Sequence, residues 1–445
     1  MSRRPHRAAI EERPAWPAGG TARSRLAPGI RAQAPVGLAL LLALAAGCAA
    51  PRHPADWLSV REVTPSFLGA LRATDPALAA DLYGRVALTF VTRDSTGRNL
   101  WISLSSDSGL TFSDPIRVNV RPDSVVSYAE GRPMAAYGSG GALAVAWSER
   151  REGSTAVDLV VRASGDAGAT FRPPVVVNDD LARPLPAYHG FPALAFQPDG
   201  SLFAAWLDER GLPVVEGEPT VSALYRATSA DGGQSWSANS MITDRACPCC
   251  RPVALSDPFG RVLLAYRRAG QNLRDPALAV SADGGRSFAL DTVISADRWF
   301  LRGCPDQGPA LTRDRPGGGH YAWYTGAGET GVYLVSWRAD HGTAGVKRRL
   351  SDSLADARSP RLALLGPSTL IGVEARPIAD SSRVVFALRA LDPDGTLTPW
   401  CFLGADVEAG WICGIDAHSA LACWIEHDGG RARTRVVKLR RKGSG

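Results

Sequence analysis

Four segments of the chain repeat one short pattern: SSDSGLTF at residues 105–112, SGDAGATF at 164–171, SADGGQSW at 229–236 and SADGGRSF at 281–288. Each has Ser, Asp, Gly, Ser or Thr, and an aromatic residue at fixed positions. The copies start 59, 65 and 52 residues apart. Recurrence at such a period indicates a repeat architecture, in which each copy marks one supersecondary unit.

The residue types in this pattern are those that close a tight turn. Asp and Ser or Thr side chains bind nearby backbone amides, and Gly adopts a positive φ without steric strain. The final aromatic residue would then anchor the turn on the sheet below it. We therefore interpret the four repeated Asp residues as structural rather than catalytic.

A second repeat, an apolar stretch of six residues, occurs seven times. The stretches are VALTFV (86–91), LAVAWS (143–148), LFAAWL (202–207), VLLAYR (262–267), HYAWYT (320–325), LIGVEA (370–375) and ALACWI (420–425). A short, continuous apolar run predicts a strand that is buried on both faces. Seven runs favour seven four-stranded antiparallel blades, and residues 58–63 would supply the last strand of the seventh, closing the ring.

The repeated turn resembles the Asp box, or bacterial neuraminidase repeat, of the sialidase-like β-propeller family. The resemblance covers about residues 60 to 440 and implies an all-β fold, a single propeller over residues 61–442. Because the sialidases have six blades, six is the alternative to seven.

Exo-sialidases of this family hold the substrate carboxylate with three Arg residues, the first within an Arg-Ile-Pro motif ahead of the first box. They use a Tyr nucleophile activated by Glu, and an Asp as acid and base. This chain has no Arg-Ile-Pro before Ser105, and its nearest form is Gly131-Arg132-Pro133. Sialidase activity therefore does not follow from the resemblance alone.

Strand direction predicts which face carries a site. In a blade, the turn between strands three and four lies on one face of the propeller. The loop that leads into the first strand and the loop that joins strands two and three both lie on the opposite face. On that opposite face we expect a ligand to meet Arg132, His189, Arg251, Asp306, Gln307 and Arg358. Three guanidinium groups would suit a carboxylated ligand; alternatively, they pair with loop acids. Candidates for catalysis, with no motif to fix a role, are Asp208, Glu209, Tyr324 and Glu374.

The cysteines form two groups. Cys247, Cys249, Cys250 and Cys304 precede two neighbouring blades and are expected to meet on the candidate face. Exported cysteines usually form disulfides; the alternatives are a Zn or Cu site, for which four sulfur ligands are suitable, and a reactive thiol. No other cofactor is expected. In the second group, Cys413 and Cys423 are expected to pair, with Cys401 as the rival partner.

The N-terminal residues 1–47 resemble an export signal. VGLALLLALAAG at 36–47 is shorter than the roughly 20 residues that span a bilayer and fits the apolar core of a signal peptide. Ala45-Ala46-Gly47-Cys48 resembles a lipobox, which predicts a lipid on Cys48 and a tether over residues 48–60. We expect anchoring to the bacterial cell envelope, on its periplasmic or outer face; an ordinary secretory signal is the alternative.

Charge argues against a nucleic-acid partner. The net charge is +6, of which residues 1–47 contribute +5 through seven Arg and two acidic residues, so no broad basic face is required. We expect a monomer that binds a glycan, a protein or a small anionic ligand on the face opposite the boxes. The alternatives are an exo-α-sialidase-type glycoside hydrolase with a divergent Arg triad, and a metal- or redox-linked envelope protein that uses the four clustered cysteines.

Overall fold

The computed structural model describes residues 56–442, except 129, 183–185, 212–220, 316, 340, 341 and 344. The predicted signal and the lipidation site Cys48 lie outside the described residues. The chain separates into two compact units, residues 1–50 and 51–445. Apart from the short helix α1 (Ser66–Ala70) and the 3-10 helix η1 (Ser139–Gly141), the described elements of the second unit are all strands. No helix among the described residues is long and apolar enough to cross a membrane.

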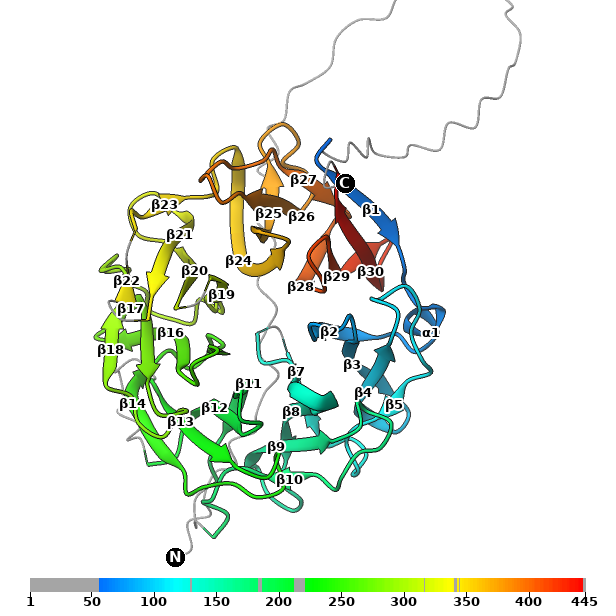
Figure 1. The fold of residues 1–445 in the computed structure, drawn as a ribbon, viewed down its shortest axis with the longest axis vertical. Helices are drawn as coiled ribbons and strands as arrows, with labels where there is room; N and C mark the ends of the chain where they lie inside the picture. The colour runs from blue at the N-terminus through cyan, green and yellow to red at the C-terminus, as the bar shows by residue number, and fades with distance from the viewer. Residues whose placement is uncertain are drawn as a thin grey trace, which may run out of the picture. The chain divides into compact units, whose positions relative to one another are not determined.

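The strands form antiparallel sheets arranged around a common centre (Figure 1). The first contains β2 (Thr74–Ala80), β3 (Val86–Asp94), β4 (Gly97–Ser105) and β5 (Ile116–Arg117). The second contains β7 (Met134–Tyr137), β8 (Leu143–Arg150), β9 (Val157–Ser164) and β10 (Val175–Val176), with β6 (Val125–Val126) beside β8. The next eight strands are β11 (His189–Phe196), β12 (Leu202–Asp208), β13 (Ser222–Ser229), β14 (Ser240–Ala246), β15 (Val253–Ser256), β16 (Val262–Gly270), β17 (Leu273–Ser281) and β18 (Leu290–Val293). Only the pairing of Ala246 with Arg268 joins β14 to β16.

Three further groups complete the arrangement. One contains β19 (Ala310–Arg315), β20 (Gly318–Thr325), β21 (Gly331–Arg338), β22 (Gly342–Thr343) and β23 (Arg348–Arg349). Another contains β24 (Leu354–Leu365), β25 (Ser368–Pro377), β26 (Val385–Leu391) and β27 (Cys401–Leu403). The last contains β28 (Val407–Gly414), β29 (Ser419–Asp428), β30 (Arg431–Arg441) and β1 (Leu58–Glu62).

The innermost strands follow one another around the centre. Each of β2, β7, β11, β15, β19, β24 and β28 contacts the next, and β28 contacts β2. The two ends of the unit meet in one sheet, where β1 pairs with β30 and Leu58 lies opposite Arg441 (Figure 1). Residues 58–60, predicted as the end of a tether, instead lie in this strand, where Leu58 is buried.

All seven apolar stretches lie in strands, namely β3, β8, β12, β16, β20, β25 and β29. β12 is buried along its whole length, because its alternate side chains pack in two different clusters. Phe203 and Ala205 pack with residues of β16, whereas Ala204 and Trp206 pack with residues of β8 and β9. Such a strand needs apolar side chains on both faces, which explains why the sequence runs apolar without alternation.

The repeated turns lie between the third and fourth strands of their sheets and contain the hydrogen bonds that their residue types predict. In the second copy, the backbone N–H and the hydroxyl of Thr170 donate to the Asp166 carboxylate at 2.8 and 2.6 Å. The Ser164 hydroxyl donates to Asp166 and accepts from the Gly168 N–H. Equivalent contacts surround Asp107, Asp231 and Asp283. These carboxylates are therefore occupied within their own turns.

We expect these turns to make the fold sensitive to acid. The Thr170 hydroxyl and N–H and the Ser164 hydroxyl lower the pKa of Asp166 from 3.8 to about 2. A carboxyl with a depressed folded-state pKa stabilises the fold above its unfolded pKa, and that contribution is lost as the pH falls towards 2. Asp166→Asn should therefore lower the urea midpoint at pH 7, with a difference from the wild type that shrinks between pH 4 and 2. A difference that does not depend on pH would contradict this account.

Neither the expected disulfide between Cys413 and Cys423 nor the rival pairing with Cys401 is present, because the thiols of Cys413 and Cys423 are both reduced. The register of β28 and β29 explains why. Cys413 lies opposite Leu421, and Cys423 lies opposite Trp411. The two cysteines are therefore offset along the hairpin rather than facing each other, a register that their spacing in the sequence did not reveal.

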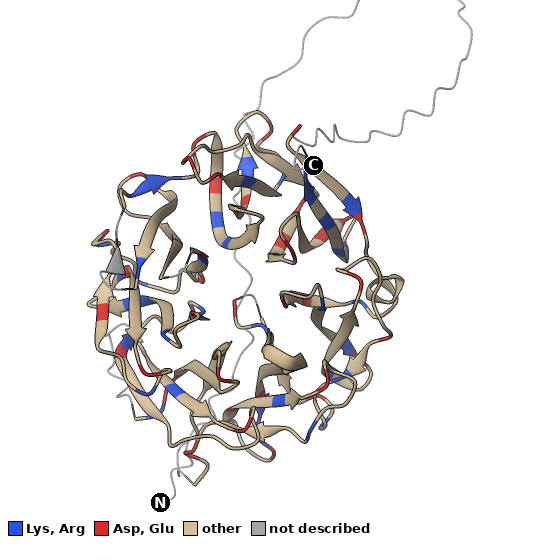
Figure 2. Cartoon of the chain, viewed as in Figure 1, with Lys and Arg blue, Asp and Glu red and all other residues tan. Residues whose placement is uncertain are grey.

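Acidic and basic residues are interspersed around the ring, and neither sign dominates one sector (Figure 2).

Candidate functional site

Buried charged side chains surround the indole of one tryptophan near the innermost strands of several sheets. We call Arg132, Arg251, Arg361, Glu130 and Trp411 the central arginine cluster. Glu130 and Arg132 lie between β6 and β7, Arg251 precedes β15, Arg361 lies on β24 and Trp411 on β28. The guanidinium carbons of Arg132, Arg251 and Arg361 lie 5.4, 5.1 and 5.0 Å from the centre of the Trp411 ring. All five side chains are buried.

Glu130 is the carboxylate of this cluster. Its side chain accepts hydrogen bonds from Arg251 Nε at 2.8 Å and from Arg361 Nη2 at 2.7 Å. Arg132 instead donates to the carbonyls of Pro76 and Ala409, both at 2.9 Å. Burial raises the pKa of Glu130, but the charges of Arg361, Arg251 and Arg132 outweigh it and lower the pKa to about 2. The carboxylate that Arg251 and Arg361 bind is therefore an internal one.

The space beside this cluster is small. The cavity lined by Arg251, Arg361 and Trp411 has a volume of about 90 Å³. Ligand pockets typically measure about 300–1,000 Å³. This cavity therefore has room for water or a small ion but not for a sugar, and the hydrogen bonds that Arg132 and Arg361 donate to the backbone tie the inner strands together.

The prediction that three particular arginines come together is wrong for one of them. Arg132 and Arg251 come together as expected, but the third guanidinium belongs to Arg361, not to Arg358. Arg358 is 43% exposed, and its Nε lies 3.5 Å from Glu374. The bulges in β24 between Ala355 and Arg361 send these two neighbouring arginines to different places, which the motif Arg358-Ser-Pro could not indicate.

A larger pocket lies between the β20–β21 loop and the start of β24. We call it the Trp299 pocket; its volume is about 550 Å³. It lies on the face opposite the repeated turns, because the β20–β21 loop joins second and third strands. Its walls include Trp299, Cys304, Gln307, Tyr324, Arg349, Asp356 and Arg358. Three of the residues expected to form a site, Gln307, Tyr324 and Arg358, thus lie together here.

Buried Arg267 holds the aromatic wall of this pocket in place. Its guanidinium donates to the carbonyl of Gln307 at 3.0 and 3.1 Å and to that of Tyr324 at 2.8 Å. It also lies 5.3 Å from the ring centre of Trp299. The rings of Trp299 and Tyr324 pack edge to face with centres 5.3 Å apart. The wall is therefore preorganised before any ligand arrives.

Three of the predicted site residues, Glu374, Tyr324 and Asp306, lie in the wall of the Trp299 pocket or next to residues of that wall. Glu374 is buried, accepts the Gly410 N–H at 3.0 Å and has a pKa raised by burial. Burial also raises the pKa of Tyr324, which is the opposite of what a phenolate nucleophile needs. Asp306 stands in the chain between Pro305 and Gln307, which line the pocket, but it is not itself a lining residue; burial and then the charge of Glu130 in the central arginine cluster raise its pKa to about 7. One carboxylate oxygen of Asp306 has no hydrogen-bond partner among the described residues.

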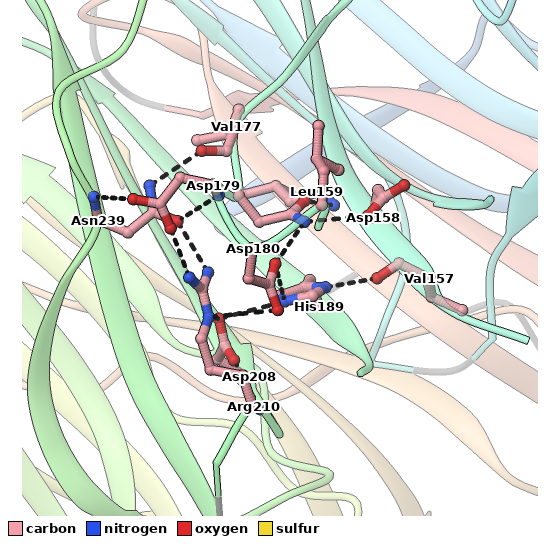
Figure 3. Close-up of polar contacts among 12 residues, drawn as sticks. Val157, Asp158, Leu159, Val177, Asp179, Asp180, His189, Asp208, Arg210 and Asn239 are labelled. Carbon is pink, nitrogen blue, oxygen red and sulfur yellow. Dashed lines mark hydrogen bonds and ion pairs between the residues drawn. The ribbon is translucent and has the colours of Figure 1, made fainter. Parts of the chain in front are cut away.

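Two other predicted residues, His189 and Asp208, belong to a separate buried network (Figure 3). His189 Nδ1 lies 2.6 Å from the Val157 carbonyl, and its Nε2 lies 3.1 Å from Asp180 and 3.5 Å from Asp208. Arg210 Nε donates to Asp208 at 2.8 Å. The network joins β12 to the loop after β10, so it fastens two sheets and does not reach the Trp299 pocket. Glu209 follows β12 and is exposed.

The four clustered cysteines meet as expected. Cys249 and Cys304 form a disulfide, while Cys247 and Cys250 are free and buried. Two of the four sulfurs are therefore joined to each other, and this state does not offer four thiolates to a metal ion.

Comparison with solved structures finds similar folds at low sequence identity. No protein-family model and no curated protein matches the chain. A protein of unknown function from Dyadobacter fermentans is 15% identical, with a TM-score of 0.47 over 87% of this chain and 99% of that one. A Hadza microbial sialidase is 17% identical, with a TM-score of 0.45 over 79% and 74%. An α-L-arabinofuranosidase from Fusarium graminearum is 14% identical, with a TM-score of 0.46 over 87% and 98%. These similarities are too distant to assign a substrate or a reaction.

Proposed function

We propose that this protein is an exported sialidase-like β-propeller that binds a small carboxylated glycan in the Trp299 pocket. The pocket carries the proposal because it combines a preorganised aromatic wall with an accessible guanidinium in one cavity of about 550 Å³. Aromatic faces pack against apolar ligand surfaces, such as the C–H face of a sugar ring. Arg358 supplies a fork of donors for a carboxylate, and it is more exposed than the three arginines of the central cluster.

The remaining features of the proposal concern the scaffold. The cycle of contacts among seven inner strands supports seven blades, and the hydrogen-bonded turns at Asp107, Asp166, Asp231 and Asp283 support their interpretation as Asp boxes. We further propose that a lipid on Cys48 anchors a monomer to the cell envelope. Membrane fractionation of the wild type beside Cys48→Ser tests the anchor, because loss of lipidation should release the protein.

Binding should depend on Arg358 and on the carboxylate of the sugar. We expect sialic acid to change the intrinsic tryptophan fluorescence, since Trp299 lines the pocket. Arg358→Gln should weaken this binding about tenfold or more, because a charge-assisted hydrogen bond contributes about 1.5–3 kcal/mol. The matched control is Arg348→Gln on β23, whose guanidinium donates to the Gly395 carbonyl outside the pocket. Equal affinities for both variants, or equal binding of galactose and sialic acid, would refute the assignment.

Glycoside hydrolysis is a second candidate, favoured by Asp306. A carboxyl with a pKa of about 7 can donate a proton near neutral pH, and its neighbours Pro305 and Gln307 line the Trp299 pocket. Turnover of a fluorogenic sialoside by the full chain, beside Asp306→Asn, tests this reaction. Hydrolysis that Asp306→Asn abolishes supports catalysis, whereas binding without turnover between pH 4 and 8 leaves the protein a binder.

A further inference from the structure

A disulfide and two free thiols lie in contact at the edge of the Trp299 pocket. Cys247 Sγ lies 3.9 Å from Cys249 Sγ and 3.4 Å from Cys250 Sγ. The turn from Cys247 to Cys250 is closed by a hydrogen bond from the Cys250 N–H to the Cys247 carbonyl. The other half of the disulfide, Cys304, is exposed and lines the pocket. The free thiol of Cys247 thus contacts the disulfide, and the free thiol of Cys250 contacts that of Cys247.

The surroundings favour Cys247 as the attacking thiol. Its pKa is lowered to about 7, first by the hydrogen bond from Cys250 and then, against the effect of burial, by the charges of Arg267 and Arg274. Both arginines are buried, and Arg274 Nε has no hydrogen-bond partner among the described residues. Burial raises the pKa of Cys250, which therefore keeps its proton and donates it towards Cys247.

We propose that Cys247, Cys249, Cys250 and Cys304 form an internal disulfide-exchange site that can release the Cys304 thiol into the pocket. In the first step the Cys247 thiolate attacks Cys249 Sγ; the Cys249–Cys304 bond breaks, and Cys304 leaves with the electron pair as a thiolate. In the second step Cys250 gives its proton to solvent and attacks Cys247 Sγ. The Cys247–Cys249 bond breaks, and a Cys247–Cys250 disulfide forms. The two thiolates released, on Cys249 and Cys304, take up protons from solvent.

The exchange balances without an external oxidant or reductant. One disulfide is lost and one is formed, and two thiols replace two thiols. Its consequence is local, because Cys304 sits between Gly303 and Pro305 in the pocket wall. After exchange, the loop that carries Asp306 and Gln307 is no longer bonded to Cys249, and the pocket contains a thiol. The inference does not depend on which ligand the pocket binds.

Trypsin separates the two halves of the disulfide, which permits a direct test. Residues 246–261 carry Cys247, Cys249 and Cys250, and residues 303–313 carry Cys304. The full chain is incubated natively with iodoacetamide, quenched, blocked with N-ethylmaleimide and digested without reduction. In the wild type we expect the linked pair to disappear with time, as alkylated Cys304 accumulates together with an internal Cys247–Cys250 disulfide. Loss of the linked pair should be about tenfold slower or more in Cys247→Ser, which lacks the attacking thiol.

Two further variants keep the test decisive. Cys423→Ser, which removes a buried thiol from β29 away from the site, should behave as the wild type. Cys250→Ser should still release Cys304 but should stop at a Cys247–Cys249 disulfide, so it reports on the first step even if Cys247→Ser does not fold. A linked pair that persists unchanged in both the wild type and Cys250→Ser overturns the proposal, as does equal loss in the wild type and Cys247→Ser.

Discussion

Glu130→Gln is expected to lower the free energy of unfolding by about 3–5 kcal/mol, the usual effect of removing one partner from a buried ion pair. Glu130 bonds Arg251 and Arg361 within 2.8 Å and is the carboxylate between three buried guanidinium groups. The substitution keeps the shape of the side chain but removes the charge. Three buried guanidinium groups would then remain around one indole without the carboxylate that bridges Arg251 and Arg361. The urea midpoint at neutral pH measures the loss.

The matched control for this prediction is Glu426→Gln, which removes the same charge from a half-buried pair. Arg435 Nε donates to Glu426 at 3.0 Å, but both side chains retain contact with solvent. An ion pair of this kind contributes about 0–1 kcal/mol. A double-mutant cycle then isolates the buried pair: Arg251→Gln should be less harmful in the Glu130→Gln background than in the wild type. Equal midpoint shifts for Glu130→Gln and Glu426→Gln would show that the central arginine cluster is not a stabilising hub.

Most of the features that the sequence predicted are local ones. The turn at Asp166 needs only residues 164–171 to close it, so its hydrogen bonds can be derived from residue types alone. The strand β12 could be derived from LFAAWL, because burial on both faces leaves a continuous apolar run. The pairing of β1 with β30 followed from the need to close a ring of sheets, a constraint of the whole fold that residues 58–63 satisfied.

The candidate site was harder to predict because it depends on backbone irregularities and register. Bulges within β24 direct Arg361 to the centre and Arg358 to the Trp299 pocket, although the two lie three residues apart. Nothing in the sequence indicates Trp299, because it stands in a loop without a motif, and only the fold brings it against Tyr324. Trp411 is one of twelve Trp residues, and nothing in its local sequence shows that three arginines surround it.

Gly285→Ala should be the second strongly destabilising substitution, by about 2–5 kcal/mol, from a strained backbone together with overpacking. Gly285 belongs to the fourth repeated turn and has a φ of +87°. A Cβ atom there would lie 2.2 Å from Cδ2 of Phe203 on β12. Phe203 is fully buried and packs on Phe288, with ring centres 5.9 Å apart, so its ring has no free space to move into. The turn thus packs tightly against the preceding sheet, and only a residue without a side chain fits at this contact.

The adjacent Gly284 separates the two causes. It also has a positive φ, +74°, but the nearest atom to its added Cβ would be the mobile end of Arg286, at 3.8 Å. Gly284→Ala should therefore cost only the backbone strain, about 1–2 kcal/mol, and the excess for Gly285→Ala measures the contact with Phe203. If that contact is the cause, Gly285→Ala in a Phe203→Leu background should be no more harmful than Gly284→Ala in the same background. Equal urea midpoints for the two single variants would mean that the sheets separate easily at this turn, and that Gly285 is required for its backbone conformation alone.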